Sequence, residues 1–210
     1  MARKVTVAAA REYVVNDINC GERDAKGAPP AIRNNMLRIP SGRPTVMCNQ
    51  VLREVMAVEY SSIEREIRID AAPEIVFEVV SDPAHVQQWW PDEAHYEVVS
   101  GSAGEILFTK DGEKFPVAFQ VADAVPYRLF SFRWTHPQGE QARQDNSFLV
   151  TFELEPADDG TLLRMTETGF RERGWEAAVL EEAYQDHGQG WDYHLARLAP
   201  YVASYLAATR

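Results

Sequence analysis

Alternation of apolar and charged residues marks the first clear element of the chain. At residues 63–69 the odd positions are mainly apolar and the even positions are mainly charged, as expected of a strand with one buried face. Pro73 then suits a first helical position because its φ angle is fixed. Asp82 before Pro83 is a typical N-cap for another helix. The pattern predicts a strand followed by two short helices that run into residues 89–91.

Five to six strand signals follow, and short turns separate them. The turns are predicted at residues 100–101, 111–112, 125–126, 136–139 and 158–160. Such short connections make neighbouring strands antiparallel. Apolar positions alternate with polar ones, so only one face of the sheet is buried. The predicted inward positions are Ile106, Phe108, Phe115, Val117, Phe119, Val121, Phe130, Phe132, Trp134, Phe148, Val150, Phe152, Leu154, Leu163 and Met165.

A C-terminal helix is predicted to cover that apolar face. Its apolar positions, at spacings of four, three, four and four, are Trp191, Leu195, Leu198, Val202 and Leu206. Burying them contributes on the order of 10 kcal/mol, at ~1.5–3 kcal/mol each. Gly188 and Gly190 are expected to separate this helix from a shorter one at residues 176–186, and Pro200 is expected to kink it. The fold class is therefore α+β, a curved antiparallel sheet around a long C-terminal helix.

Composition changes abruptly near residue 55. Residues 1–55 hold nine Lys/Arg, five Asp/Glu and a single aromatic residue, whereas the remaining 155 residues hold 12 basic and 27 acidic side chains. The net charge runs from +4 to −15, which together give the −11 of the whole chain. A segment with so few large apolar side chains cannot offset its ordering entropy. We predict a disordered tail over residues 1–58 and one domain over residues 59–208.

Two explanations of the first segment stay open. It is either a real basic tail that contacts an acidic surface, or an extension from a start codon assigned too far upstream, since Met36, Met47 and Met56 all precede the domain. No apolar run approaches the ~20 residues that span a bilayer, and the N-terminus lacks the pattern of a signal peptide. We predict a soluble, cytoplasmic protein in which Cys20 and Cys48 are free thiols.

The acidity of the domain argues against nucleic-acid binding, which needs clustered Lys and Arg. The five histidines show no metal-ligand spacing, and no nucleophile elbow or phosphate loop is present. We therefore predict no metal, no cofactor and no catalytic residue.

Several ordered motifs resemble a known family. They are Arg65-Glu66-Ile67, Ala72-Pro73-Glu74, Asp82-Pro83, Trp89-Trp90-Pro91, residues 125–129, Thr151-Phe152-Glu153-Leu154, residues 166–170 and Gly190-Trp191. Their order and spacing over residues 63–207 resemble the START-like, or SRPBCC, superfamily. Within it they are similar to the C-terminal domain of activators of heat-shock protein 90 ATPase.

The resemblance implies a helix-grip fold with a cavity between the sheet and the terminal helix. In the superfamily this cavity accepts lipids, hormones, polyketides or other apolar molecules, and a minority of members catalyse cyclisation or hydrolysis there. It also implies that the first and last strands are neighbours. By alternation Arg65 and Glu167 then both face inward, which predicts a buried ion pair that either anchors a ligand headgroup or is structural.

Large aromatic residues on every element around that cavity suit an apolar or planar ligand. Trp89 and Trp90 are adjacent, so one of them is expected at the rim. His187 beside Asp186 is interpreted either as a general-base pair or, preferably, as part of an exposed helix end. The predicted ligand-binding residues are Arg65, Trp89, Trp90, Phe119, Trp134, Phe152, Glu167 and Trp191.

The favoured function is non-catalytic binding of a small, largely apolar molecule in the cavity. One alternative is a cyclase- or hydrolase-type enzyme that uses Glu167, Arg65 or His187. Another is a protein-interaction module similar to the chaperone activator. A homodimer or a chaperone contact therefore stays open as a partner.

Overall fold

The computed structural model describes residues 60–209. The expectations about the earlier segment, including the disordered tail, the two thiols and the start codon, lie outside the described residues. Within residues 60–209 no helix is long and apolar enough to cross a membrane.

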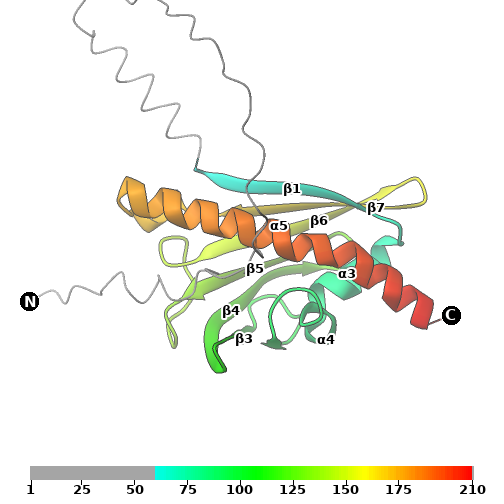
Figure 1. The fold of residues 1–210 in the computed structure, drawn as a ribbon, viewed down its shortest axis with the longest axis horizontal. Coiled ribbons are helices and arrows are strands. Elements are labelled where there is room, and N and C mark those ends of the chain that lie inside the picture. The colour runs from blue at the N-terminus through cyan, green and yellow to red at the C-terminus, as the bar shows by residue number, and fades with distance from the viewer. Residues whose placement is uncertain (1–59, 210) are drawn as a thin grey trace, which may run out of the picture.

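A seven-stranded antiparallel sheet forms the body of the domain (Figure 1). Its strands are β1 (Ser62–Ile69), β2 (Glu93–His95), β3 (Ala103–Lys110), β4 (Glu113–Val125), β5 (Leu129–His136), β6 (Phe148–Ala157) and β7 (Gly160–Thr168). The spatial order is β1-β7-β6-β5-β4-β3-β2, so only β1 leaves its sequence neighbours and pairs with the last strand. The predicted antiparallel hairpins and the pairing of first and last strands are confirmed.

Two short helices, α3 (Pro73–Ser81) and α4 (Pro83–Val86), follow β1 as predicted. Each begins at a proline, and the Asp82 carboxylate caps α4 by accepting a hydrogen bond from the Ala84 N–H at 2.8 Å. Both helices lie beneath the C-terminal half of the last helix (Figure 1). Their buried residues pack at one end of the hydrophobic core between the sheet and that helix.

The C-terminal helix α5 (Ala177–Ala208) runs unbroken across the sheet (Figure 1). The expected break at Gly188 and Gly190 is therefore wrong. A helical glycine costs only about 1 kcal/mol relative to alanine, and buried side chains on either side, such as Ala183 and Trp191, hold the helix on the sheet. Pro200 lies inside the helix without ending it.

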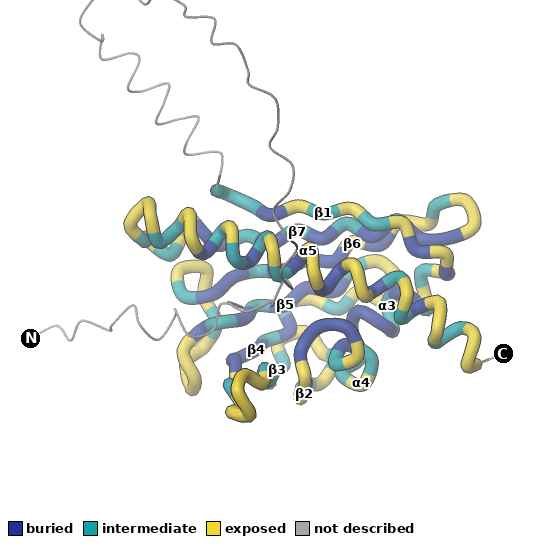
Figure 2. The backbone as a smooth tube through the Cα atoms, in the orientation of Figure 1, coloured by how far each residue is buried: buried dark blue, intermediate teal, exposed yellow. Residues whose placement is uncertain are grey.

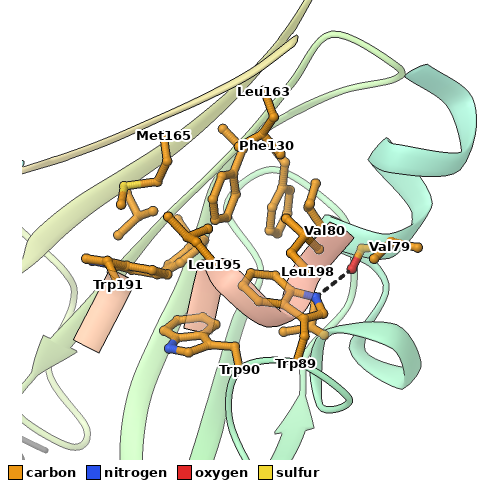
Figure 3. Close-up of a cluster of buried hydrophobic side chains, with 14 of the residues drawn as sticks. Val79, Val80, Trp89, Trp90, Phe130, Leu163, Met165, Trp191, Leu195 and Leu198 are labelled. Carbon is orange, nitrogen blue, oxygen red and sulfur yellow. Dashed lines mark hydrogen bonds between the residues drawn. The ribbon is translucent and has the colours of Figure 1, made fainter. Parts of the chain in front are cut away.

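Buried residues recur along α5 and along the strands of the sheet (Figure 2), and the buried apolar residues of both belong to one cluster. Trp191, Leu195, Leu198 and Val202 are buried as predicted, and Leu206 near the helix end is half-buried. Figure 3 shows Leu195 and Leu198 between Trp191, Trp89 and Val80. A 3-10 turn at Arg171–Arg173 connects β7 to α5.

Two bulges interrupt the regular pairing of β4 with β5, one between Val121 and Asp123 and one between Ala118 and Phe119. Phe119 pairs with Trp134 and Ala118 pairs with His136, so Thr135 has no partner in the register. Its φ of 63° is unusual for a β-branched residue and belongs to this bulge.

Candidate functional site

A fully buried carboxylate lies in the layer between the sheet and α5. Glu167, on β7, has 0% of its surface exposed, and among residues 60–209 it is the one acidic side chain that is buried. Leu163 and Met165 precede it on the same face, so the alternation along β7 directs it inward as predicted.

Three side chains converge on this carboxylate. The indole N–H of Trp134 donates to Oε1 at 2.8 Å, and that of Trp191 donates to Oε2 at 2.7 Å. Nδ1 of His187 lies 3.0 Å from Oε1 and 3.1 Å from Oε2. Trp134 lies on β5, whereas His187 and Trp191 lie one helical turn apart on α5. The cluster therefore forms only when the helix is packed on the sheet.

The geometry indicates the role of each group. Indoles can only donate, and bonds of 2.7–2.8 Å are typical of N–H donors facing an ionised oxygen. Nδ1 of His187 is almost equidistant from both oxygens, which suits an N–H that donates to a carboxylate. We assign a proton to Nδ1 on that basis. Glu167 thus holds two indoles and one imidazole in fixed orientations.

Aromatic rings surround the cluster. The ring of Trp90 lies 5.1 Å from that of Trp191 and 5.4 Å from that of Trp134, centroid to centroid. The ring of His187 lies 5.2 Å from Trp134 and 4.5 Å from Phe148. Such spacings are those of interacting aromatic pairs, so the polar cluster is embedded in tilted and edge-on rings.

Both adjacent tryptophans are buried, so the expectation that one lies at the rim is wrong. Trp89 is 0% and Trp90 is 6% exposed. They follow α4 in a turn rather than in a strand, and consecutive side chains therefore need not alternate. The indole N–H of Trp89 donates to the Val79 carbonyl at 3.1 Å, as Figure 3 shows.

The predicted ion pair between Arg65 and Glu167 is also wrong. Arg65 is opposite Met165 in the register, whereas Glu167 is opposite Ile63. The guanidinium of Arg65 instead donates to the Asp192 carboxylate on α5, from Nε at 2.6 Å and from Nη2 at 3.2 Å. This exposed pair, in which the hydrogen bond to Asp192 raises the pKa of Arg65, joins β1 to the helix at the sheet edge.

Phe119 and Phe152, the remaining predicted site residues, are both buried in the core. Phe152 contacts Trp89 and Trp191 at 6.1 and 6.2 Å between ring centroids. Phe119 stacks on Tyr96 and Phe132 at 4.4 and 4.5 Å. Six of the eight predicted site residues thus lie together in the structure: Trp89, Trp90, Trp134, Phe152, Glu167 and Trp191. Phe119 is connected to them through the ring of Phe132, and Arg65 lies outside this cluster.

Sequence reasoning misplaced His187. The residue was expected at an exposed helix end beside Asp186, but it is buried within α5 and bonded to Glu167. His187 lies four residues before Trp191, so both side chains lie on the same face of the helix. This spacing is the feature of the sequence that indicates a buried His187. Asp186 is half-buried, and burial raises the pKa of its carboxyl.

Other buried polar atoms lie at the end of β5 and in the turn before α5. Thr135 Oγ1, His136 Nδ1 and Arg173 Nη1 are buried without a hydrogen bond. Burial lowers the pKa of His136 and of Arg173, whose guanidinium lies over the rings of Phe148 and Trp175. No group of three His, Cys, Asp or Glu side chains within residues 60–209 is arranged to hold a metal ion.

A curved antiparallel sheet that grips a long C-terminal helix, with two short helices after the first strand, defines a helix-grip, START-like α+β domain. Residues 70–203 match the family model described as activator of Hsp90 ATPase homolog 1-like protein. The chain belongs to this family. No curated protein matches it.

Solved structures support the same fold. A Nitrosomonas europaea protein has a TM-score of 0.58 at 13% identity, with 71% of this chain and 98% of that chain covered. A Mesorhizobium loti protein has a TM-score of 0.53 at 22% identity, with 68% and 97% covered. The Aha1 dimer from Colwellia psychrerythraea has a TM-score of 0.51 at 20% identity, with 67% and 95% covered. At these identities the likeness concerns the fold alone.

Proposed function

We propose that this domain binds a small, largely apolar molecule between the sheet and α5. The observation that carries the proposal is the carboxylate of Glu167, fully buried among aromatic rings and held by Trp134, Trp191 and His187. The proposed site also includes Trp90, whose ring lies against both of the other indoles.

An entirely apolar core would hold the sheet and the helix together at a lower cost in folding free energy than one that contains a carboxylate. Removing a carboxylate from water costs several kcal/mol, and well-packed apolar residues often replace buried ionic groups at no loss of stability. A buried charge that stability does not require is therefore a candidate for a functional role. The three donors already occupy the carboxylate, so we assign Glu167 the role of orienting the rings and assign ligand contact to the rings themselves.

Native mass spectrometry of freshly purified protein tests the proposal directly. We expect a co-purified small molecule that leaves on mild activation. Intrinsic fluorescence supplies a second readout, because four tryptophans surround the proposed site: saturable quenching by the neutral dye N-phenyl-1-naphthylamine is expected in the full chain.

A matched pair of variants separates the site from the rest of the surface. Glu167→Gln should weaken binding of the dye at least several-fold, whereas Glu153→Gln, the same change at an exposed position of β6, should leave it unchanged. Equal effects of the two changes, or no saturable binding at all, would contradict the proposal.

A second candidate function is acid–base catalysis, and the Glu167–His187 pair favours it. A carboxylate that fixes one nitrogen of an imidazole and leaves the other free is the arrangement of a general base. Hydrolysis of 4-nitrophenyl esters distinguishes the two functions. Saturable turnover that Glu167→Gln and His187→Phe abolish, with folding intact and with Glu153→Gln active, would replace non-catalytic binding by an enzyme of the hydrolase type.

A further inference from the structure

The first half of α5 carries charge of a single sign. Between Arg173 and Arg197 the chain has no lysine or arginine, and all five of its charged side chains there are carboxylates. These carboxylates, which we call the acidic face, are exposed or half-buried: Glu176, Glu181, Glu182, Asp186 and Asp192. Exposed positions recur along this half of the helix in Figure 2.

The carboxylates of the acidic face repel one another. Glu182 and Asp186 are four residues apart and therefore lie on the same side of the helix, where like charges are unfavourable. Besides burial, the charge of Glu182 raises the pKa of Asp186. Arg65 on β1 neutralises only the last of the five, Asp192, within the contacts already described. A group of positive charges on this face would thus be attracted by several carboxylates at once.

The segment that precedes the domain carries a run of the opposite charge. Residues 25–53 hold five basic side chains and no aspartate or glutamate. The five are Lys26, Arg33, Arg38, Arg43 and Arg53. This run carries a charge of +5 and the acidic face carries −5, so the two match in number as well as in sign.

The chain enters the domain beside the acidic face. The ring of Tyr60 lies 5.2 Å from that of Tyr184 on α5, centroid to centroid, and the Tyr184 hydroxyl donates to the Ser62 carbonyl at 2.8 Å. Glu176 and Asp192 are each eight residues from Tyr184, which is about 12 Å along a helix. The seven residues from Arg53 to Tyr60 reach up to about 24 Å when extended. The basic run is therefore attached within reach of the whole acidic face.

We propose that residues 25–53 of this chain bind the acidic face of α5, through ion pairs between their lysine and arginine side chains and the carboxylates of that face. Exposed ion pairs are individually weak, so the contact depends on several charges together and weakens as salt is added. For the same reason it adds little to the stability of the domain. It uses side chains other than those of the proposed ligand site.

Paramagnetic relaxation in the full chain tests the contact, because both cysteines of the protein, Cys20 and Cys48, precede the domain. A nitroxide is attached to Cys48, inside the basic run, in a Cys20→Ser background. At about 10 mM salt, where the Debye length is about 30 Å, we expect the backbone amides of residues 176–192 to be selectively broadened. At about 1 M salt, where the Debye length is about 3 Å, the broadening should fall by at least about threefold.

A matched pair of triple variants separates attraction from the mere proximity of a tethered label. The first removes three charges of the acidic face: Glu181→Gln, Glu182→Gln and Asp186→Asn. The second removes three charges at exposed positions outside α5: Glu97→Gln, Asp111→Asn and Glu113→Gln. The first should reduce the broadening at low salt by at least about threefold, because three exposed pairs are lost together, and the second should leave it unchanged. The amide spectra themselves report whether each variant is folded.

A mixing experiment distinguishes contact within one chain from contact with a second copy. Nitroxide-labelled chain without ¹⁵N is mixed with ¹⁵N-labelled chain that carries no nitroxide, and we expect no broadening of residues 176–192. Broadening in the mixture would assign the basic run to a second copy and overturn the contact within one chain. Equal broadening in the two triple variants, or broadening that does not respond to salt, would overturn the contact altogether.

Discussion

At the scale of single residues, Glu167 illustrates what an alternating pattern can and cannot predict. Its inward orientation follows from its place two positions after Met165 on a half-buried strand. The alternating pattern does not predict its hydrogen-bond partners, because these depend on which side chains of β5 and α5 lie next to the carboxylate in the folded domain. The structure replaces the expected Arg65 with Trp134, Trp191 and His187.

Glu167→Gln should lower the free energy of unfolding by about 1–3 kcal/mol. Each carboxylate oxygen accepts an indole N–H, so the amide NH₂ of glutamine must face one donor and leave it buried without a partner. Urea denaturation followed by circular dichroism measures the change.

The exposed Glu153→Gln change is the control and should stay within about 0.5 kcal/mol. A double-mutant cycle between Arg65 and Glu167 should give a coupling energy near zero, since Arg65 pairs with Asp192. Strong coupling there, or an unaltered stability of Glu167→Gln, would contradict the geometry of the cluster.

At the scale of elements, α5 shows tertiary packing overriding local propensity. Two glycines and a proline suggest interruptions, yet the helix spans Ala177–Ala208 because its apolar stripe is buried against the sheet along most of that length. The stripe itself is plain in the sequence at helical spacing.

Leu198→Ala should destabilise the domain by about 2–5 kcal/mol. Its side chain is 0% exposed and lies in the centre of the contact between α5 and the sheet, so truncation leaves a cavity. Leu206→Ala on the same helix is the matched comparison and should cost clearly less, because that side chain is only half-buried. Thermal and urea unfolding give both values, and equal costs would mean that the helix does not pack as described.

His194 on α5 should make stability depend on mildly acidic pH. Burial lowers the pKa of its imidazole from 6.5 to about 4, although its hydrogen bond to the Trp89 carbonyl and the nearby Asp92 oppose the shift. The unfolded chain therefore takes up the proton first as the pH falls. Because His194 stays neutral in the folded protein, it contributes roughly 3 kcal/mol to the free energy of unfolding. This contribution is complete above about pH 6.5 and is lost as the pH falls towards 4.

The measurement is the free energy of unfolding between pH 7 and pH 4.5 in the original protein and in His194→Asn, which keeps an N–H near the position of Nδ1. The free energy of unfolding of His194→Asn should decrease less steeply with falling pH than that of the original protein. Parallel curves would show that His194 does not titrate differently in the folded and unfolded states.

At the scale of the whole molecule, the shift of net charge from +4 to −15 near residue 55 divides the chain into two parts. The family match begins at residue 70, and the first described strand begins at Ser62. A chain that starts at Met56 should therefore unfold at the same temperature and urea concentration as the full chain, because tails typically contribute within about 0.5 kcal/mol. A loss of more than about 2 kcal/mol on truncation would show that the first segment supports the domain.

The sequence by itself determined the elements of this protein and the face that each one buries. Periods of two and of about 3.6 residues depend only on backbone geometry, so the strands, the two proline-started helices and the stripe of α5 can be read from residue spacing. Only the tertiary structure decided which buried groups meet. His187 lies 20 residues from Glu167 along the chain and Trp134 lies 33 residues away, and their contact depends on sheet register and helix docking, which no local pattern encodes.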